Sequence, residues 1–439
     1  MRVNTAARVG QDQLTHEGGV ARALTHEQQL RRSVMACMLW EDTFYEDGQS
    51  VADRIAAAVE KVKFEKVAEI AIEAREKMKL RHAPLFLARA LATRKAGRQM
   101  GDLLERIIQR PDELTEFLAL YWKDGKKPLA KQVKVGLARA FRKFNEYQLA
   151  KYNRDEKVKL RDVLFLSHAK PKDEAQAAMW KRLVDGTLAT PDTWEVSLSA
   201  GVDKKEAFVR LMAEGKLGGL AFLRNLRNMH EAGVEKAAVA SYANGLKVER
   251  VLPFRFITAA RVVPQWEDVL EPLMMKCLSE QFKLPGRTVL LLDVSGSMND
   301  RLSAKAETTR MDAGLGLGVL LREICDETEV FTFSNVIAQV APRRGFALRD
   351  AMKNSQPHSG TYLAQAVAAI NAKVKFDRLI VVTDEQTADG IVTPNGKGYV
   401  INVGTYKNGV GYGKWLHIDG WSEAVIDYIR VYEGANDVR

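Results

Sequence analysis

The spacing of apolar residues divides the chain into two parts. From Gln28 to Phe282, apolar residues recur at every third or fourth position with short breaks at Gly, Pro or Asp, which is typical of amphipathic helices. After Lys283 to Arg287, short apolar runs alternate with helical ones, which predicts a doubly wound, mostly parallel sheet. We therefore expect a multidomain α and α/β protein, with helical repeats at residues 25–284 and the sheet at 285–439.

The helical part contains many segments of similar length joined by short turns. Such helices usually pair antiparallel and stack as an α-solenoid, here without a strict repeat period. Residues 1–24 are mostly polar and include Gly18-Gly19, so we expect a loose N-terminal arm. The predicted helices are Val51–Lys63, Phe64–Lys79, Pro84–Lys95, Met100–Gln109, Asp112–Lys123, Pro128–Asn145, Asp173–Asp185, Lys204–Glu214, Leu217–Gly233 and Trp266–Phe282.

The second part alternates strands with helices. The predicted strands are Thr288–Asp293, Glu329–Ser334, Val336–Ala341, Arg378–Asp384 and Tyr399–Val403. The predicted helices are Thr309–Glu327, Phe346–Asn354, Tyr362–Ala372 and Ser422–Tyr432. Because the strands are parallel, the groups that follow them gather at one edge of the sheet, where open α/β sheets bind their ligands.

Carboxylate and hydroxyl side chains follow two of these strands. Mg²⁺ prefers octahedral oxygen coordination and keeps some waters, so a few such side chains supply part of its shell. The sequence therefore predicts a divalent cation site, most simply for Mg²⁺, at this edge. The predicted ligands are Asp293, Ser295, Ser297, Thr361 and Asp384.

The ordered set Asp-x-Ser-x-Ser, Thr, Asp resembles the metal-ion-dependent adhesion site (MIDAS) of von Willebrand factor A domains. The resemblance implies that Ser295, Ser297 and Thr361 bind the metal directly, and that Asp293 and Asp384 bind it directly or through water. One alternative is a metal-free domain of this fold in which these residues cap helices. Another is a phosphoryl-accepting Asp293, which the absence of a phosphatase-type lysine motif disfavours.

The positive charge is concentrated in one segment. The chain has a formal net charge of +10, and residues 121–172 carry 11 Lys and 4 Arg against 5 acidic residues, which equals the whole excess. A basic concentration of this kind favours RNA over a small acidic substrate. The alternative is a set of solvated helix faces. The RNA contacts predicted from this segment include Lys123, Lys126, Lys127, Lys131, Lys134, Arg139, Arg142, Lys143 and Lys170.

Helical spacing places Lys131, Lys134 and Arg142 on one face, where they would neutralise phosphates and make the affinity for RNA depend on salt. Tyr147 and Tyr152 are candidates either to stack on an unpaired base or to pack between helices. The three cysteines, Cys37, Cys277 and Cys325, are far apart, which argues against disulfides and a zinc cluster and favours buried apolar roles.

The sequence contains no long apolar run and no signal peptide at residues 1–13, so we expect a cytoplasmic protein without a membrane partner. No catalytic motif is recognised, and we expect that the protein is not an enzyme. A chelatase-type or ATPase accessory subunit is disfavoured because no glycine-rich phosphate-binding motif precedes the sheet domain.

Three phrases of the helical part resemble the TROVE module of the Ro autoantigen family. They are RHAPLFLAR at Arg81–Arg89, KLRDVLFLSHAKP at Lys159–Pro171 and FLRNLRNM at Phe222–Met229. The resemblance, from about Gln28 to the C-terminus, implies a bacterial-type Ro ribonucleoprotein. Its HEAT-like repeats would form a ring closed by the A domain, with Y RNA on the outer surface and single-stranded 3′ ends of misfolded RNA in the central hole.

The basic segment coincides with the Y RNA-binding region of that family. By resemblance, Lys151 and His168 bind RNA, whereas a family arginine falls at Asp155, so that either the neighbouring Arg154 substitutes for it or this RNA contact is lost. Arg81, His82 and Arg89, and likewise Arg224, Asn225 and Arg227, have either structural roles or RNA contacts.

The leading prediction is a monomeric, non-catalytic RNA-binding protein for RNA quality control or ribonucleoprotein scaffolding. The resemblance also implies an exoribonuclease partner such as polynucleotide phosphorylase. The alternative is an adaptor whose A-domain metal binds an acidic residue of a protein partner.

Overall fold

The computed structural model describes residues 14–35, 47–94, 97–199, 201–248, 251, 253–279, 283–422 and 424–433. These residues divide into two compact units. The first contains residues 14–25, 47–49 and 193–433, and the second contains residues 26–35 and 50–192. The change in sequence pattern at 283–287 therefore does not separate the units, because the helices that follow residue 193 pack with the sheet.

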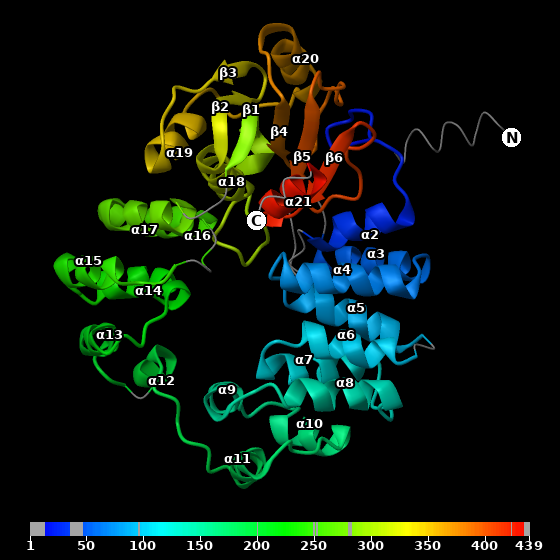
Figure 1. Ribbon diagram of the computed structural model, residues 1–439, viewed down its shortest axis with the longest axis vertical. Helices are drawn as coiled ribbons and strands as arrows, with labels where there is room; N and C mark the ends of the chain where they lie inside the picture. The colour runs from blue at the N-terminus through cyan, green and yellow to red at the C-terminus, as the bar shows by residue number, and fades with distance from the viewer. Residues whose placement is uncertain are drawn as a thin grey trace, which may run out of the picture. The chain divides into compact units, whose positions relative to one another are not determined.

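The second unit consists of helices that stack on their sequence neighbours and next-but-one neighbours, such as α4 on α5 and α6 on α8 (Figure 1). Its elements are α2 His26–Met35, α3 Gly48–Glu60, α4 Phe64–Glu76, α5 His82–Ala92, α6 Gln99–Ile107, α7 Pro111–Tyr121, α8 Lys131–Phe141, α9 Glu146–Tyr152, α10 Leu160–Ser167 and α11 Glu174–Asp185. Three of them, α2, α9 and α10, were not among the predicted helices. They are short, and Leu149 is the one buried residue of α9.

Glycine determines how closely α6 and α8 approach. Both Gly101 of α6 and Gly136 of α8 lie at the crossing, and a Cβ at Gly136 would stand 2.7 Å from Leu104 Cβ and 2.9 Å from Gly101 O. Apolar side chains such as Leu104 and Leu137 are fully buried around this crossing. The close packing at this crossing therefore fixes the position of α8, which carries much of the basic segment.

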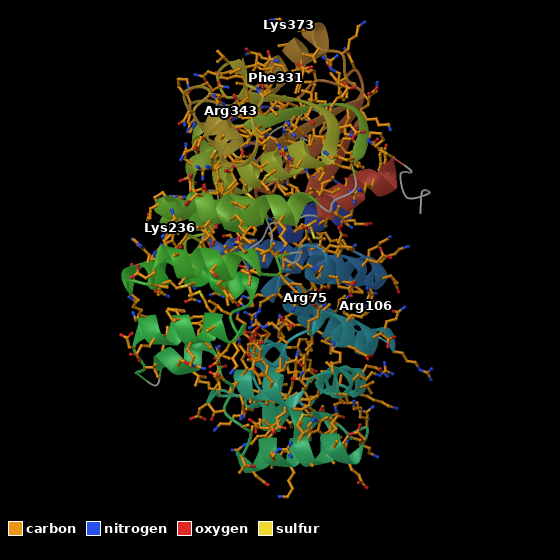
Figure 2. The ribbon with its side chains drawn as sticks, turned by 60° about the vertical axis from the view of Figure 1, so that its left-hand side comes forward. Arg75, Arg106, Lys236, Phe331, Arg343 and Lys373 are labelled. Carbon is orange, nitrogen blue, oxygen red and sulfur yellow. The ribbon has the colours of Figure 1, made fainter. Side chains whose placement is uncertain are left out.

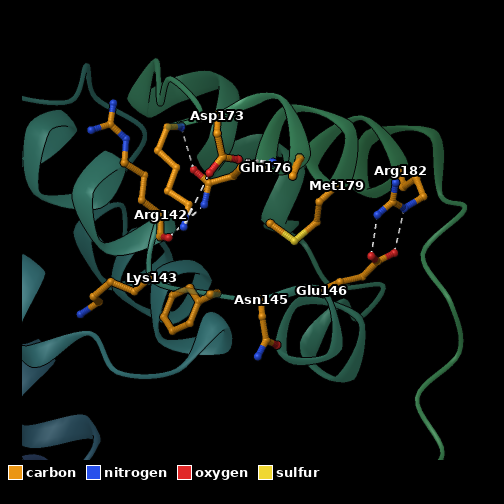
Figure 3. A pocket seen from close by; sticks show the side chains of 11 residues that line it. Arg142, Lys143, Asn145, Glu146, Asp173, Gln176, Met179 and Arg182 are labelled. Carbon is orange, nitrogen blue, oxygen red and sulfur yellow. Dashed lines mark hydrogen bonds and ion pairs between the residues drawn. The ribbon is translucent and has the colours of Figure 1, made fainter.

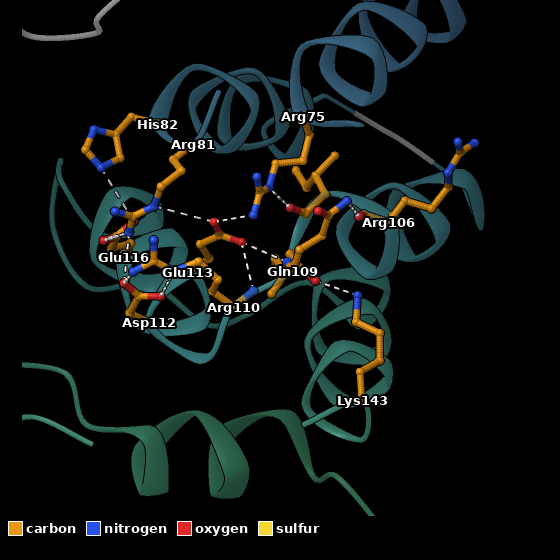
Figure 4. A network of polar contacts seen from close by, with 12 residues as sticks. Arg75, Arg81, His82, Arg106, Gln109, Arg110, Asp112, Glu113, Glu116 and Lys143 are labelled. Carbon is orange, nitrogen blue, oxygen red and sulfur yellow. Dashed lines mark hydrogen bonds and ion pairs between the residues drawn. The ribbon is translucent and has the colours of Figure 1, made fainter. Parts of the chain in front are cut away.

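A buried polar network joins α4, α5 and α7 (Figure 4). Arg75 donates to Glu113 at 2.7 Å and to the carbonyl oxygen of Ile107 at 3.0 Å, and Glu113 is fully buried. Arg81 reaches Asp112 at 2.9 Å and Glu116 at 2.8 Å. The buried carboxylates of Asp112 and Glu113 each have an arginine partner. The network is therefore a structural clamp that holds α4, α5 and α7 together.

The first unit contains further helices and one six-stranded sheet. Its helices before the sheet are α12 Trp194–Ser199, α13 Lys204–Ala213, α14 Gly219–Glu231, α15 Lys236–Asn244, α16 Pro253–Val262 and α17 Glu267–Ser279. The helix α16 packs on α18 (Arg310–Ile324), and α17 packs on α19 (Gly345–Lys353), so these helices form one unit with the sheet domain.

The sheet has the strand order β3-β2-β1-β4-β5-β6. All pairs are parallel except β2 with the edge strand β3, which agrees with the predicted doubly wound, mostly parallel sheet. Its strands are β1 Leu284–Asp293, β2 Cys325–Phe333, β3 Ile337–Gln339, β4 Arg378–Thr383, β5 Lys397–Asn402 and β6 Trp415–Asp419, and the remaining helices are α20 Leu363–Lys373 and α21 Ala424–Tyr432.

Helices cover both faces of the sheet. Val289 and Leu291 of β1 belong to a buried cluster with Val367 of α20. The alternate residue Leu292 contacts the opposite face, where Gly318 of α18 lies close to it. Phe331 lies within the sheet, whereas Lys373 stands at the outer end of α20 (Figure 2).

The N-terminal segment contradicts the prediction of a loose arm over its described residues. Residues 14–20 form a tight turn that closes with a bridge between Leu14 and Val20. Thr15 Oγ1 donates to the carbonyl oxygen of Thr387 at 2.6 Å, and the backbone N–H of Arg22 donates to Gly409 O at 2.9 Å. The sequence pattern did not reveal this docking because the turn is bonded mainly through backbone groups.

Candidate functional site

The predicted metal ligands lie at the carboxyl edge of the sheet. Asp293 is the last residue of β1, and Asp384 follows the last residue of the neighbouring strand β4. Both carboxylates are buried, with exposed fractions of 2% and 0%. Ser295 and Thr361 are buried as well, and Ser297 is half-buried in the short helical turn Gly296–Asn299.

Hydrogen bonds connect four of the five predicted ligands. Ser297 Oγ donates to Asp384 Oδ2 at 2.9 Å, and Ser295 Oγ lies 3.4 Å from Ser297 Oγ. The backbone N–H of Ser295 donates to Asp293 Oδ1 at 2.9 Å, and Thr383 Oγ1 donates to Asp293 Oδ2 at 2.5 Å. Both oxygens of Asp293 thus have protein donors, which suits a carboxylate that holds a metal-bound water.

Thr361 joins the same edge through its backbone. Its carbonyl oxygen accepts from the N–H of Ala388 at 2.9 Å and from Thr387 Oγ1 at 3.0 Å. The same loop, residues 384–389, begins with Asp384 and receives the N-terminal turn at Thr387. The position of Thr361 therefore depends on a loop that the N-terminal segment contacts.

The electrostatics of this edge fit a divalent cation. Burial, followed by the nearby charge of Asp384, raises the pKa of Asp293 to about 7. A carboxylate pair that is costly to ionise in a buried site is stabilised by a bound cation. Two carboxylates and three hydroxyls are hard oxygen donors of the kind that Mg²⁺ prefers. The residues present therefore fit the predicted ion.

Arg310 adds a positive charge that the sequence pattern did not predict. This first residue of α18 is 2% exposed, donates to the carbonyl oxygen of Ser297 at 2.7 Å, and places Nη1 4.0 Å from Asp384 Oδ2. Thr309 and Asp312 form a capping box that starts α18 at this point. A buried guanidinium thus partly balances the two carboxylates.

The basic segment forms a groove between α8 and α10. The groove has a volume of about 320 Å³. Its α8 wall follows one helix face, and its other wall is the end of α10, where His168 adopts a left-handed backbone conformation with φ 53°. The lining residues are Lys131, Lys134, Val135, Ala138, Arg139, Arg142, Ser167 and His168, of which five are predicted RNA contacts.

A second pocket of about 390 Å³ adjoins the first at Arg142 (Figure 3). Arg142 Nε donates to the carbonyl oxygen of Lys170 at 2.7 Å, which ties the end of α8 to the segment after α10. On the far side, Arg182 of α11 donates to both carboxylate oxygens of Glu146, at 2.8 and 2.5 Å. Arg142 therefore lies between two hollows on one surface.

The remaining predicted RNA contacts differ in their surroundings and in their exposure. Lys126 stands 5.6 Å above the ring of Trp122, and Lys127 stands 4.8 Å above that of Tyr121. Lys143 is engaged by the fold, because Nζ donates to the carbonyl oxygens of Glu105 and Ile108 and burial lowers its pKa. We therefore leave Lys143 out of the interface. Lys123, Arg154 and Lys170 are exposed, and Lys151 is half-buried.

The predicted aromatic contacts differ from each other. The guanidinium of Arg110 lies 4.6 Å above the ring of Tyr152, whereas Tyr147 is 51% exposed. Asp155, at the position of the family arginine, forms an ion pair with Lys159 at 2.5 Å, and Arg154 beside it is exposed.

Several residues for which the sequence allowed either a structural role or an RNA contact have partners within the protein. Arg81 belongs to the clamp described above, and Arg89 forms an ion pair with Asp124. Asn225 is buried and donates to Ala221 O at 2.9 Å, while Arg227 reaches Glu307 at 3.1 Å. The cysteines Cys277 and Cys325 are buried, as expected, and Cys37 lies outside the described residues.

Comparisons with known proteins agree with the fold. Residues 181–311 match the family model of the TROVE domain, and residues 287–397 match that of the Ro60 vWA domain. The crystal structure of the Ro (RSR) protein of Deinococcus radiodurans is similar, with a TM-score of 0.61 and 18% identity over 93% of this chain and 99% of that chain. No curated protein matches.

The fold defines a class: a protein of stacked helices with a C-terminal von Willebrand factor A domain. The TROVE match precedes the Ro60 vWA match along the chain, and the two overlap at residues 287–311. The chain thus carries a TROVE-type segment and a Ro60-type vWA segment, and its fold is similar to that of the Deinococcus radiodurans Ro protein. Among its described helices, none has the length and apolar character needed to cross a membrane.

Proposed function

We propose that this Ro-type protein binds RNA through the groove between α8 and α10. The observation that carries the proposal is the gathering of Lys131, Lys134, Arg139, Arg142 and His168 around one hollow of about 320 Å³. Cationic side chains at this density neutralise several phosphates at once and release their counterions. A set of merely solvated helix faces would not need to converge on a shared hollow.

The finer proposal is that the bound RNA is a small noncoding RNA of the Y type, with single-stranded 3′ ends of misfolded RNA as a second ligand. The TROVE match supports it, as does the position of His168 on the groove. The protein would act without catalysis, in RNA quality control or as a ribonucleoprotein scaffold. An exoribonuclease such as polynucleotide phosphorylase would be its protein partner.

We further propose that Mg²⁺ binds at the carboxyl edge through Ser295, Ser297 and Thr361, with Asp293 and Asp384 acting directly or through water. A bound ion would offer an open position to an anionic oxygen of a partner. The adaptor function, in which a protein carboxylate fills that position, depends on this site. It is the second candidate function because the donor set fits a cation.

A salt titration tests the RNA proposal. Lys131→Glu with Lys134→Glu should weaken the binding of a structured RNA with a single-stranded tail and reduce the slope of log K against log salt by about 1 to 2. The matched control is Lys373→Glu with Lys375→Glu, which makes the same charge change on exposed residues of the A domain. Equal salt slopes in both double variants would reject the groove as the phosphate site.

A further inference from the structure

The solvent-facing side of α10 exposes an aromatic ring beside the groove. Phe165 is 60% exposed, although most phenylalanines of the described chain, such as Phe141 and Phe144, are buried. The opposite side of α10 is held by Leu160, Val163 and Ser167, which are all buried. The helix therefore does not need Phe165 for its packing, and the exposed ring is unexplained by the fold.

The ring lies in a row with two basic residues. Arg161 and Phe165 are exposed and four residues apart, so they share one face of α10, and the exposed His168 follows at the C-terminal cap of the helix. The row ends at the groove, because His168 and its neighbour Ser167 form the α10 wall. An aromatic ring is thus placed between Arg161 on one side and the cationic groove on the other.

We infer that Phe165 is a stacking platform for an unpaired base of a single-stranded RNA whose phosphates lie in the groove between α8 and α10. Base–aromatic stacking tolerates any base, because every base has a flat π-face. Arg161 and the groove residues Lys131 and Lys134 hold the phosphates on either side of the stacked nucleotide. The inference rests on the proposed function and specifies the RNA: a segment with an exposed base, not a continuous duplex.

Charge complementarity decides between RNA and an apolar protein partner. A hydrophobic protein surface placed over Phe165 would also cover Arg161 and remove its charge from water at a cost. A single strand satisfies both parts of the surface at once, since it offers a base to the ring and phosphates to the cations. The neighbouring Leu166, 37% exposed, points to a different side of the helix.

The test compares a short oligoadenylate single strand with a blunt RNA duplex of the same length, using fluorescence anisotropy on the full chain. Phe165→Ala should weaken single-strand binding by about 5- to 150-fold and leave duplex binding and the salt slope unchanged. Phe165→Trp should restore the affinity. In an oligoadenylate that carries 2-aminopurine, the wild-type protein should quench the fluorescence, and Phe165→Ala should abolish the quenching.

Leu166→Ala is the matched control, because it removes an exposed apolar side chain from the same helix without removing a ring. Equal single-strand affinity of Phe165→Ala and the wild type, while Lys131→Glu with Lys134→Glu loses binding, would overturn the stacking role and leave the proposed function standing. If neither variant changes RNA binding, the proposed function fails as well. Equal losses of single-strand affinity in Phe165→Ala and Leu166→Ala would show that the loss of apolar surface, and not the loss of the ring, weakens binding. That result would also overturn the inference.

Discussion

Individual buried charges at the carboxyl edge of the sheet balance one another. Asp293 and Asp384 are buried together, and the Arg310 guanidinium approaches Asp384 to 4.0 Å. A divalent cation bound at Asp384 would lie close to this guanidinium and experience its repulsion. The affinity of the proposed Mg²⁺ site would therefore depend on a residue that is not itself a predicted ligand.

Arg310→Gln should strengthen Mg²⁺ binding by about 5- to 50-fold, because it removes a positive charge next to the predicted ion while keeping a donor for Ser297 O. The same change should lower the unfolding free energy of the metal-free protein, since two buried carboxylates lose their counter-charge. Isothermal titration with Mg²⁺ and urea unfolding measure the two effects. Unchanged affinity, as expected for the exposed control Arg301→Gln, would contradict the prediction.

A buried histidine gives the A domain a pH dependence. His417 lies 2.8 Å from Glu385, 3.3 Å from Asp419, and 4.0 Å from the ring centroid of Tyr412. Burial lowers the pKa of His417, but Asp419 and Glu385 outweigh burial and raise it to about 9, above the ordinary value of 6.5. The charged histidine therefore stabilises the fold below pH 6.5, and this contribution disappears as the pH rises through about 9.

His417→Gln should lower the unfolding free energy by up to about 3 kcal/mol near pH 6, and the difference from the wild type should shrink as the pH approaches 10. Urea unfolding of both proteins at several pH values measures this difference in unfolding free energy. A difference that stays constant with pH would mean that packing against Tyr412, not charge, is what the substitution removes.

Sequence patterns revealed the residues of this edge only in part. Asp293, Ser295 and Ser297 stand at fixed spacing after an apolar run, so a local pattern was sufficient to predict them. Thr383 and Arg310 bond to these residues across the sheet edge. Their roles depend on pairs that are 90 and 13 residues apart, which a local pattern does not contain.

At the scale of elements, α8 connects the core of its unit to the proposed RNA groove. Gly136→Ala should destabilise the protein by about 1–3 kcal/mol, because the added Cβ would stand 2.7 Å from Leu104 Cβ at the crossing with α6. RNA affinity should fall with it, since α8 would shift. Denaturant unfolding and anisotropy measure the two effects.

Gly245→Ala is the control for this substitution, because the nearest atom to its added Cβ is 3.9 Å away. A similar loss of stability at both glycines would show that the close approach of α6 and α8 is not the cause.

The N-terminal turn acts on the loop that carries Asp384. Gly19→Ala should detach the turn, because a Cβ there would overlap the carbonyl oxygen of Thr387. Faster amide exchange at residues 384–389 and weaker Mg²⁺ binding should follow, since Thr387 also holds Thr361. Val20→Ala, at a side chain that is 74% exposed, should leave both measurements unchanged.

Element prediction was most accurate where apolar periodicity was long. Strands β1 and β4 and helices such as α4 and α18 lie where the pattern placed them. The strand β6, Trp415–Asp419, was missed because its five residues include His417 and Asp419, whose polar side chains are buried by tertiary contacts. Helices α15 and α16 were also missed.

At the scale of the whole molecule, the two candidate sites belong to different units. The groove lies on helices of the second unit, and the metal edge lies in the first. Asp293→Ala with Ser295→Ala should abolish Mg²⁺ binding and leave RNA affinity within about twofold, because the two proposed sites share no residue and lie in separate compact units. An equal loss of RNA binding would refute this independence.

The two-part sequence pattern predicted the fold class but not the division into units. Residues 193–279 have the same helical periodicity as the preceding residues, yet α16 and α17 pack on α18 and α19 of the A domain. Periodicity shows that a helix has an apolar face, not which partner covers that face. For this reason the sequence pattern did not show that α16 and α17 pack with the A domain.

The docking of Thr15 on Thr387 also has a consequence for biosynthesis. The two residues are 372 positions apart. At ordinary translation rates the first emerges from the ribosome about 20 to 75 s before the second. During that time the N-terminal turn lacks the loop at Thr387 on which it docks, whereas the helices between them can already fold. The nascent chain would therefore complete the groove between α8 and α10 before the carboxyl edge of the sheet.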